Sequence, residues 1–256
     1  MATPESGATW LVLPTYNEAE NIEPFVAAVR DNLPAGSQIL VVDDNSPDGT
    51  GARADALAER HDNVAVLHRR DKEGIGPAYI AGFRRALAAG AGLVLEMDSD
   101  FSHDPAYLPR LLEAAKRADL VLGSRYVAGG GVSDWGPVRR AISRGGSTYA
   151  RLVLGVDVRD LTGGFKCFHR EVLEAIDLDS VKARGYAFQV EMTYRAIRQG
   201  FRVVEVPIVF RDRRAGNSKM DRSIVAEAAW QVPRLRFSRE RRENAGSAAG
   251  QRRYTF

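Results

Sequence analysis

Three features that would each indicate a particular class of protein are missing from this sequence. Its 256 residues include a single cysteine, Cys167, which excludes an intrachain disulfide framework and a cysteine-based zinc site. The longest uncharged apolar stretch of note, residues 86–95, is about half a membrane span and contains two glycines. The first nine residues have neither a basic start nor an apolar run, so they do not resemble a secretory signal. We therefore expect a cytoplasmic protein that is not an integral membrane protein.

Several well-known catalytic signatures are missing as well. The sequence contains no Walker phosphate-binding loop, no HExxH zinc motif and no GxSxG nucleophile elbow. Gly74-Ile75-Gly76 resembles the start of a dinucleotide-binding fingerprint, but Tyr79 occupies the position of the third glycine. We interpret this segment as a turn at the start of a helix, with direct phosphate binding as the alternative.

Composition and length indicate an ordinary globular chain, whereas the charge is unevenly distributed. With 45% apolar and 27% charged residues, the chain can form one sizeable domain without stabilising cross-links. Residues 211–242 hold ten Lys and Arg against four acids, and residues 135–156 hold four Arg and no acid. Such basic clusters attract nucleic acid, anionic lipid or phosphorylated substrates, or simply form a solvated surface. Because no aromatic platform is interleaved with the arginines, we exclude nucleic acid as a partner.

The first half of the chain alternates short apolar runs with amphipathic stretches, which is typical of βαβ units. We predict strands at residues 10–14, 39–43, 64–67, 93–97 and 120–124, and helices at residues 21–32, 48–60, 77–89 and 105–117. The predicted strands are almost continuously apolar, as expected when helices cover both faces of a sheet. The pattern predicts an α/β fold with a mostly parallel central sheet flanked by helices.

The second half has a less regular pattern. We expect a glycine-rich loop at residues 127–137, helices at residues 138–154 and 188–199, and strands at residues 165–168 and 202–210. A last helix is predicted at residues 222–232, ended by Pro233. Residues 238–256 are polar and rich in arginine, so we expect a basic disordered tail.

Charged side chains follow several predicted strands at the point where each strand ends. In open α/β sheets, ligands bind beyond the carboxyl ends of the strands, so Asp44, Asp98, Asp100 and Arg125 are expected to converge on one crevice. Asp98 and Asp100 are two residues apart, and in extended backbone such side chains face the same way. Two hard oxygen ligands suit Mg²⁺ or Mn²⁺. The alternative is that these acids bind no metal and simply precede a helix, with the neighbouring His103 as a capping or core residue.

The motifs, taken together and in order, resemble a known family. Leu13-Pro-Thr-Tyr-Asn-Glu18, Val41-Val-Asp-Asp-Asn-Ser-Pro-Asp-Gly-Thr50, Lys72-Glu-Gly-Ile-Gly76, Met97-Asp-Ser-Asp100 and Gly123-Ser-Arg125 are similar to motifs of the family 2 inverting glycosyltransferases. The finer details resemble the polyprenol (dolichol) phosphate mannose synthases within that family. They are the segments at residues 130–135, 139–144, 161–166, 185–191 and 210–219. The resemblance implies a GT-A (Rossmann-like) fold in a single domain over residues 1–237.

The resemblance also assigns roles to residues. Nucleotide-sugar contacts are implied for Pro14, Tyr16, Glu18, Val42, Asp44, Asp98, Ser99, Asp100, Arg125, Gln189, Arg213 and Lys219. Acceptor-phosphate contacts are implied for Arg139, Arg140, Arg144, Arg213 and Lys219. Asp98, Asp100 and Arg125 are implied as catalytic, and Asp98 and Asp100 as metal ligands. Ser102 stands where many relatives carry Gln as a further ligand on the metal side.

The implied reaction is transfer of mannose from GDP-mannose to a polyprenyl phosphate, with inversion and with Mg²⁺ or Mn²⁺. The alternative is a polyprenyl phosphate glucose synthase or another family 2 transferase that uses a UDP-sugar. Residues of about 9–125 would form a nucleotide-binding half, and residues of about 126–237 an acceptor-binding half. We expect a peripheral enzyme on the cytoplasmic face of a membrane, held by its basic surface or by a separate membrane-anchoring protein.

Overall fold

The computed structural model describes residues 7–181, 183, 185–212 and 222–237, and within 222–229 it describes only the course of the helix. The predicted tail at residues 238–256 lies outside the described residues. So do two predicted phosphate-binding cations, Arg213 and Lys219.

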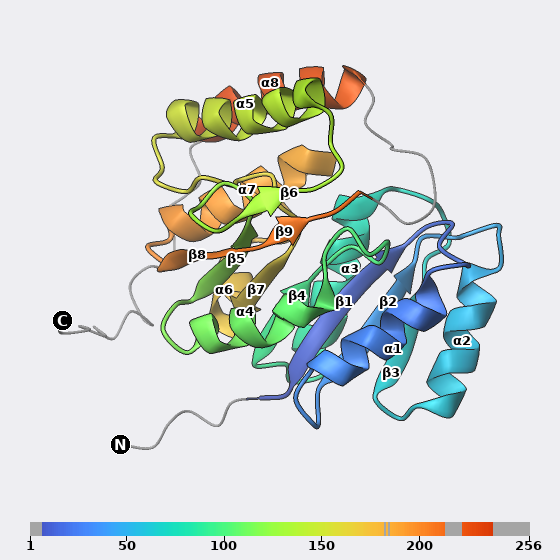
Figure 1. Ribbon diagram of the computed structural model, residues 1–256. Coiled ribbons are helices and arrows are strands. Elements are labelled where there is room, and N and C mark those ends of the chain that lie inside the picture. Colours follow the sequence, from blue (N-terminus) through green and yellow to red (C-terminus); the bar gives the residue numbers. More distant parts are fainter. Residues whose placement is uncertain (1–6, 182, 184, 213–221, 238–256) are drawn as a thin grey trace, which may run out of the picture.

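A seven-stranded sheet forms the centre of the molecule (Figure 1). Its order is β3 (Val64–His68), β2 (Gln38–Asp43), β1 (Thr9–Thr15), β4 (Leu93–Glu96), β7 (Lys166–His169), β5 (Leu120–Ser124) and β8 (Val203–Pro207). β7 is antiparallel to both of its neighbours, and the other neighbouring pairs are parallel. The predicted α/β class and the mostly parallel sheet are therefore confirmed. Parallel strands bring their carboxyl ends to one edge, where the acidic motifs lie.

Helices cover both faces of the sheet. The helices are α1 (Ile22–Asn32), α2 (Thr50–Arg60), α3 (Ile75–Ala88), α4 (Leu108–Ala115) after a 3₁₀ turn (Pro105–Tyr107), α5 (Pro137–Leu154), α6 (Arg170–Ala175), α7 (Gly185–Arg198) and α8 (Arg222–Phe237). Leu11 and Leu13 pack with α1, α2 and α4, whereas Trp10 and Val12 pack with α3, α6 and α7. Successive strand side chains point to opposite faces, so a continuously apolar strand fills two cores at once.

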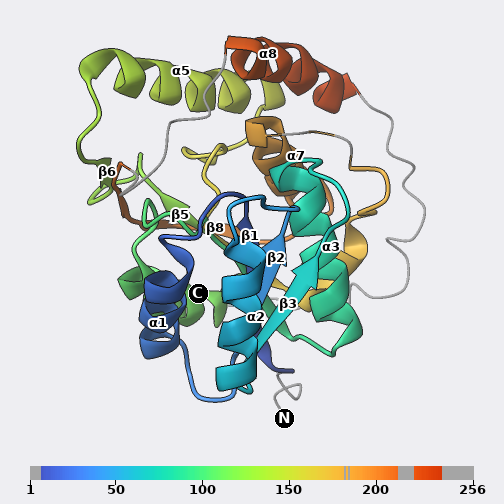
Figure 2. The same cartoon turned by 90° about the vertical axis from the view of Figure 1, so that its right-hand side faces the viewer.

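Helices α5 and α8 form a further layer outside α7. Both views show the two helices lying side by side, with α7 between them and the sheet (Figures 1 and 2). In the described part of the chain, no helix combines the length and apolarity needed to cross a membrane. This outer layer is placed close to the edge of the sheet that carries the acidic motifs.

The predicted end of the last helix at residue 232 is wrong, because α8 continues through Pro233 to Phe237. Val232 is buried, and Leu235 packs against the same core cluster. The Arg236 guanidinium donates a 2.8 Å hydrogen bond to the carbonyl oxygen of Leu154 at the end of α5. These tertiary contacts offset the hydrogen bond that a proline removes from a helix.

The predicted strand at residues 202–210 is interrupted at Ile208. Its second part, β9 (Val209–Phe210), leaves the main sheet and pairs with β6 (Gly131–Val132) in a small parallel sheet. The strand β6 lies within the segment predicted as a glycine-rich loop. The prediction missed this pairing because each partner is only two residues long and the partners are far apart in the sequence.

Candidate active site

A cavity of about 270 Å³ lies at the carboxyl ends of β1, β2, β4 and β5. It is closed on its other sides by the start of α3, the loop at residues 162–164 and the start of α7. Of the residues predicted to bind donor or acceptor, those that line it are Pro14, Tyr16, Glu18, Asp44, Asp98, Ser99, Asp100, Arg125, Arg139 and Gln189. The fold therefore brings together residues that are up to 175 positions apart in the sequence, from Pro14 to Gln189.

Asp98 and Asp100 follow β4 directly and both line the cavity. Asp100 is 3% exposed and accepts a 3.0 Å hydrogen bond from the Ser102 amide, which fixes its carboxylate. The Asp98 carboxylate lies 3.4 Å from the hydroxyl of Tyr79, which donates to it. Burial, followed by the charge of Asp98, raises the pKa of Tyr79 well above its ordinary value, so this hydroxyl stays protonated.

The His103 side chain contacts the main chain of the acidic pair at Asp98. Its Nδ1 accepts a 3.2 Å hydrogen bond from the Asp98 amide and lies 3.8 Å from Oδ2 of the same residue. The ring is buried and packs between Phe165 and Phe210, with centroid distances of 5.3 and 5.2 Å. The geometry favours the interpretation of His103 as a core residue that positions Asp98.

The acidic pair fits a divalent cation that takes its other ligands from elsewhere. No group of three or more His, Cys, Asp or Glu side chains gathers around one point in the described parts of the chain. Ser102 does not line the cavity; its hydroxyl is buried and makes no hydrogen bond to any described residue. Mg²⁺ and Mn²⁺ commonly bind one or two carboxylates, with water and substrate phosphates completing the shell. Asp98 and Asp100 meet that requirement without Ser102.

The end of β1 places an aromatic ring at one side of the cavity. The ammonium group of Lys72 lies 3.7 Å from the centroid of the Tyr16 ring, a cation–π contact. Lys72 also lines the cavity, and it was not predicted as a site residue. Its signal was the segment Lys72–Gly76, which is one of the family motifs and whose glycines we interpret as a turn, with direct phosphate binding as the alternative.

Asp44 shapes that same turn. Its carboxylate accepts hydrogen bonds from the amides of Glu73 and Gly74, at 3.3 and 2.9 Å, and forms an ion pair with Arg69. The turn leads into α3; Gly74, which precedes the helix, and Ile75, its first residue, both line the cavity wall. Asp44 is therefore a cavity residue that also holds the neighbouring wall in place.

Val42 is not brought to the cavity. Its side chain is fully buried in the core cluster, and a methyl group at Gly82 of α3 would lie 3.2 Å from it. The Val42 carbonyl oxygen accepts a 3.3 Å hydrogen bond from the Thr15 hydroxyl. The side chain points away from the carboxyl edge because side chains alternate along β2 and this one faces α3.

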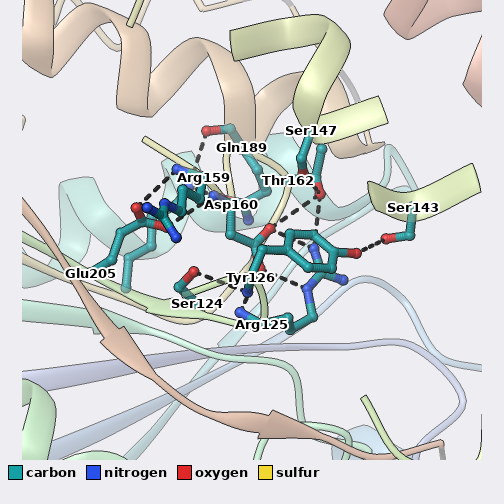
Figure 3. A network of polar contacts seen from close by, with 11 residues as sticks. Ser124, Arg125, Tyr126, Ser143, Ser147, Arg159, Asp160, Thr162, Gln189 and Glu205 are labelled. Atoms are coloured by element: carbon teal, nitrogen blue, oxygen red, sulfur yellow. Dashed lines mark hydrogen bonds and ion pairs between the residues drawn. The ribbon is translucent and has the colours of Figure 1, made fainter. Parts of the chain in front are cut away.

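Arg125, at the end of β5, is held by an acid that the sequence did not reveal (Figure 3). Its Nε and Nη2 donate 2.7 Å hydrogen bonds to the two oxygens of Asp160, and Nη2 also donates to the Thr162 hydroxyl. Both charged groups are buried, at 6% and 0% exposed. Burial on its own raises the pKa of Asp160, but the charge and hydrogen bonds of Arg125 outweigh it and lower that pKa. Arg125 therefore lines the cavity, but its positive charge is balanced by the negative charge of Asp160.

The loop that carries Asp160 is fixed on two further sides (Figure 3). The carboxylate of Glu205, on β8, accepts 2.9 Å hydrogen bonds from the amides of Arg159 and Asp160. The hydroxyls of Ser147 and Thr162 are 3.0 Å apart, which connects the loop to α5. Asp160 directly precedes the segment at residues 161–166, which is one of the family motifs, but no role was predicted for this acid.

The predicted acceptor-binding arginines are not equivalent. Arg139 lines the cavity, where its guanidinium covers the Trp135 ring at 4.2 Å and pairs with Asp212 at 3.0 Å. Arg140 and Arg144 are exposed on α5 and do not line the cavity. Of the three predicted arginines on α5, one therefore lies at the cavity and two point toward solvent.

A buried charged pair lies beneath the cavity. Glu96 and Lys166 are both fully buried, with Oε1 and Nζ 3.3 Å apart. Burial raises the pKa of Glu96 to about 7 although the Lys166 charge opposes this shift. Lys166 also donates hydrogen bonds to the main-chain and side-chain oxygens of Gln189. Neither member of the pair was predicted from the sequence.

Comparison with known proteins assigns this chain to a family. A family model described as glycosyl transferase family 2 matches residues 10–177. An undecaprenyl-phosphate mannosyltransferase from Micrococcus luteus is 50% identical over 223 residues, which are 87% of this chain and 91% of the relative. A polyprenol monophosphomannose synthase from Mycolicibacterium smegmatis is 50% identical over 226 residues, 88% of this chain and 85% of the relative.

Solved structures show a shared fold at lower identity. Glucosyl-3-phosphoglycerate synthase from Mycobacterium tuberculosis, crystallised with Mn²⁺, UDP and phosphoglyceric acid, has a TM-score of 0.64 and 21% identity. The match covers 88% of this chain and 78% of that one. A mycobacterial protein of known structure has a TM-score of 0.65 and 20% identity, over 90% of this chain and 73% of that one. These likenesses confirm the predicted GT-A fold.

Proposed function

Because the chain belongs to glycosyl transferase family 2, we propose that it transfers mannose from GDP-mannose to a polyprenyl phosphate, giving polyprenyl phosphate mannose. The observation that carries this proposal is the 50% identity, over almost the whole of both chains, with an enzyme named undecaprenyl-phosphate mannosyltransferase. A phosphate oxygen of the acceptor attacks C1 of the sugar while the bond from C1 to the diphosphate breaks. This single displacement inverts the configuration at C1.

Asp98 and Asp100 are the residues proposed to hold Mg²⁺ or Mn²⁺. A divalent cation bound there would act as a Lewis acid on the diphosphate leaving group. The Ser102 amide and the Tyr79 hydroxyl each donate to one carboxylate, so the two side chains are oriented before any ligand arrives. Pre-oriented charged groups lower the reorganisation that catalysis requires.

We assign the nucleotide to the wall formed by the ends of β1 and β2. Pro14, Glu18, Asp44 and Ser99 line this wall, and Tyr16 offers the aromatic face for the base. The Lys72 ammonium covers the Tyr16 ring, so a base that stacks on Tyr16 must displace it. Lys72 is then available to the diphosphate.

The acceptor phosphate is assigned to the basic side of the cavity. Arg139 lines it, and the proposal extends to Arg140, Arg144, Arg213 and Lys219. An acceptor phosphate is already an anion at neutral pH, so the mechanism needs no general base, and we assign none. Arg125 contributes directed N–H groups with little net charge, because Asp160 neutralises it.

The outer layer of helices is proposed to rest on the cytoplasmic face of a membrane. α5 exposes Val138, Ile142 and Leu152, and α8 exposes Trp230 and Phe237. Arginines lie beside them on both helices, and apolar side chains flanked by arginine are typical of helices at a lipid interface. Residues of about 9–125 then form the donor half, and residues of about 126–237 the acceptor half.

Transfer of radiolabel from GDP-mannose into an organic-extractable product, with polyprenyl phosphate and Mg²⁺ or Mn²⁺, tests the proposal. We expect label from GDP-mannose and not from UDP-glucose, lost with chelator and with Asp100→Ala. Label from UDP-glucose alone would show that the donor assignment is wrong and would leave the proposed acceptor and mechanism unchanged. A lack of label from both donors, with membranes or a membrane-anchored partner added, would contradict the proposal.

A further inference from the structure

The residue that follows the acidic pair, Phe101, has a strained main chain. Its φ is 63°, which lies in the left-handed region. The other non-glycine residues with positive φ in the described parts of the chain are Asn17, Asn45 and Asp134. Short Asn and Asp side chains tolerate this region, whereas a bulky residue is an outlier there. The strain at Phe101 therefore requires a contact that offsets it.

The left-handed turn at Phe101 directs the next residue back toward the acidic pair. The Ser102 amide donates a 3.0 Å hydrogen bond to Oδ1 of Asp100, which is 3% exposed. The Ser102 carbonyl oxygen accepts a 3.1 Å hydrogen bond from the amide of Arg211, which follows β9. Both bonds depend on the direction that the chain takes after Phe101. The conformation of Phe101 thus fixes the orientation of the Asp100 carboxylate.

The ring of Phe101 holds this turn in place. It packs edge-on against the ring of Phe25 in α1, with centroids 4.9 Å apart and an interplanar angle of 82°. Phe25 is fully buried, and Phe101 packs against the core cluster to which Phe25 belongs. Edge-to-face pairs of this kind stabilise a structure beyond the burial of their area. Strained backbone persists only where its surroundings hold it, and here the ring contact does so.

We propose that Phe101 is a positioning residue for the divalent cation, because its ring keeps the main chain in the turn that orients Asp100. If the turn relaxed to an ordinary conformation, the Ser102 amide would leave the Asp100 carboxylate. Apparent affinity falls with the fraction of molecules in the competent conformation, so cation binding would weaken. This role rests on the proposed function, in which Asp98 and Asp100 hold the cation.

Binding of Mn²⁺ alone, followed by electron paramagnetic resonance of the free ion, tests this role without turnover. Phe101→Ala removes the ring and keeps the left-handed penalty, so we expect the affinity to fall about tenfold. Phe101→Gly also removes the ring, but glycine adopts positive φ without a steric penalty, so its affinity should fall about threefold or less. A role in packing alone predicts that alanine, the larger residue, does at least as well as glycine. Equal affinities for the two variants, or a lower affinity for glycine, would overturn the proposal.

Gly36→Ala is the matched control for backbone strain. Gly36 has a φ of 83° in the turn before β2, at the opposite end of that strand from the acidic motifs, and nothing lies within 4 Å of an added methyl. The variant introduces the left-handed penalty away from the cavity, so it should lower the melting temperature and leave Mn²⁺ affinity unchanged. A loss of affinity as large as that of Phe101→Ala would show general destabilisation and overturn the proposal.

A second variant keeps the test decisive where the glycine variant does not fold. Asparagine tolerates the left-handed region, so Phe101→Asn should bind Mn²⁺ more tightly than Phe101→Ala. Circular dichroism and melting curves report whether each variant is folded. An affinity of Phe101→Asn no higher than that of Phe101→Ala would contradict the role of the turn.

Failure of this role and failure of the proposed function give different results. Unaltered Mn²⁺ affinity in the Phe101 variants, in a protein that transfers mannose, would overturn the role of Phe101 alone. If the unaltered protein binds Mn²⁺ but transfers sugar from no donor, the proposed transfer is wrong, and the comparison of alanine with glycine still decides the role. An unaltered protein that binds no Mn²⁺ would contradict both the metal site and the positioning residue.

Discussion

Arg125 and Asp160 form a two-pronged ion pair inside the protein, in which two guanidinium nitrogens each lie 2.7 Å from a different carboxylate oxygen. Asp160 also accepts a 2.9 Å hydrogen bond from the Arg125 amide. The pair joins the end of β5 to the loop that closes the cavity. It turns the arginine predicted to supply positive charge into a rigid, neutral part of the wall.

Removing the carboxylate of this pair should destabilise the protein strongly. Asp160→Asn leaves the Arg125 guanidinium buried without a counter-charge, which we expect to cost about 3–5 kcal/mol in the free energy of unfolding. Asp157→Asn removes an exposed partner of Arg151 and should cost less than about 1 kcal/mol. Urea unfolding of the two variants measures the difference, and similar costs would show that the Arg125–Asp160 pair is not structurally important.

The acidic pair should be required for turnover and not for folding. Asp98→Asn keeps the size of the side chain and removes a charge at the proposed cation site, so we expect transfer to fall by at least about a hundredfold. Asp104→Asn is the control, because Asp104 caps the next helical turn and Asn caps equally well. Transfer rates at varied metal concentration check this prediction. Unchanged rate and metal dependence in Asp98→Asn would rule out its proposed role.

His68 should make stability depend on pH. Its Nε2 lies 2.8 Å from a carboxylate oxygen of Asp55, and its Nδ1 lies 3.7 Å from one of Asp43. The hydrogen bond to Asp55, together with both acidic charges, raises the pKa of His68 above 6.5. The stabilisation is therefore fully present below pH 6.5 and is lost as the pH rises through the raised pKa.

The size of this effect is limited because half of the His68 side chain is exposed. We expect the free energy of unfolding of the unaltered protein to exceed that of His68→Asn by less than about 1 kcal/mol at pH 5.5. This difference should vanish at alkaline pH. Unfolding of both proteins from pH 5 to 9 measures it. A gap that does not change with pH would show that the ion pairs contribute nothing.

Two helical glycines should respond in opposite ways to alanine. At Gly82 of α3, an added methyl would lie 2.3 Å from Cγ1 of Val12, so Gly82→Ala should cost about 1–3 kcal/mol. At Gly145 of α5, nothing lies within 4 Å of the added methyl. Gly145→Ala should therefore raise stability by about 0.5–1 kcal/mol through helix propensity. Melting curves of both variants check the sign, and equal shifts would contradict the packing of α3 on β1.

Membrane binding should depend on the outer helices. Leu152 is 74% exposed on α5, and Arg144 is exposed on the same helix. Arg144→Gln should weaken binding to anionic vesicles about fivefold, since one arginine near such a surface contributes about 1 kcal/mol. Leu152→Ser should weaken it further, whereas Arg53→Gln, exposed on α2, should have little effect. Vesicle flotation at two salt concentrations measures the binding. Identical results for Arg144→Gln and Arg53→Gln would exclude the outer layer of α5 and α8 as the membrane-binding face.

The sequence by itself determined the sheet and the acidic part of the site. Apolar runs predicted the strands because burial on both faces leaves no room for polar residues. Asp98 and Asp100 could be paired because their spacing is a local property of extended backbone. The carboxyl-edge rule then placed them with Asp44 and Arg125.

Only the tertiary structure decided what each charged group faces. Arg125 meets Asp160 across 35 residues, Lys166 meets Gln189 across 23, and Arg236 caps α5 across 82. No local period in the sequence encodes these contacts, because they depend on which strands and helices become neighbours. For the same reason, the prediction that the last helix ends at Pro233 was wrong. Packing against α5 and the core stabilises the helix beyond this residue. Local spacing can predict that a charge is present, but its partner, and therefore its chemistry, is set by the fold.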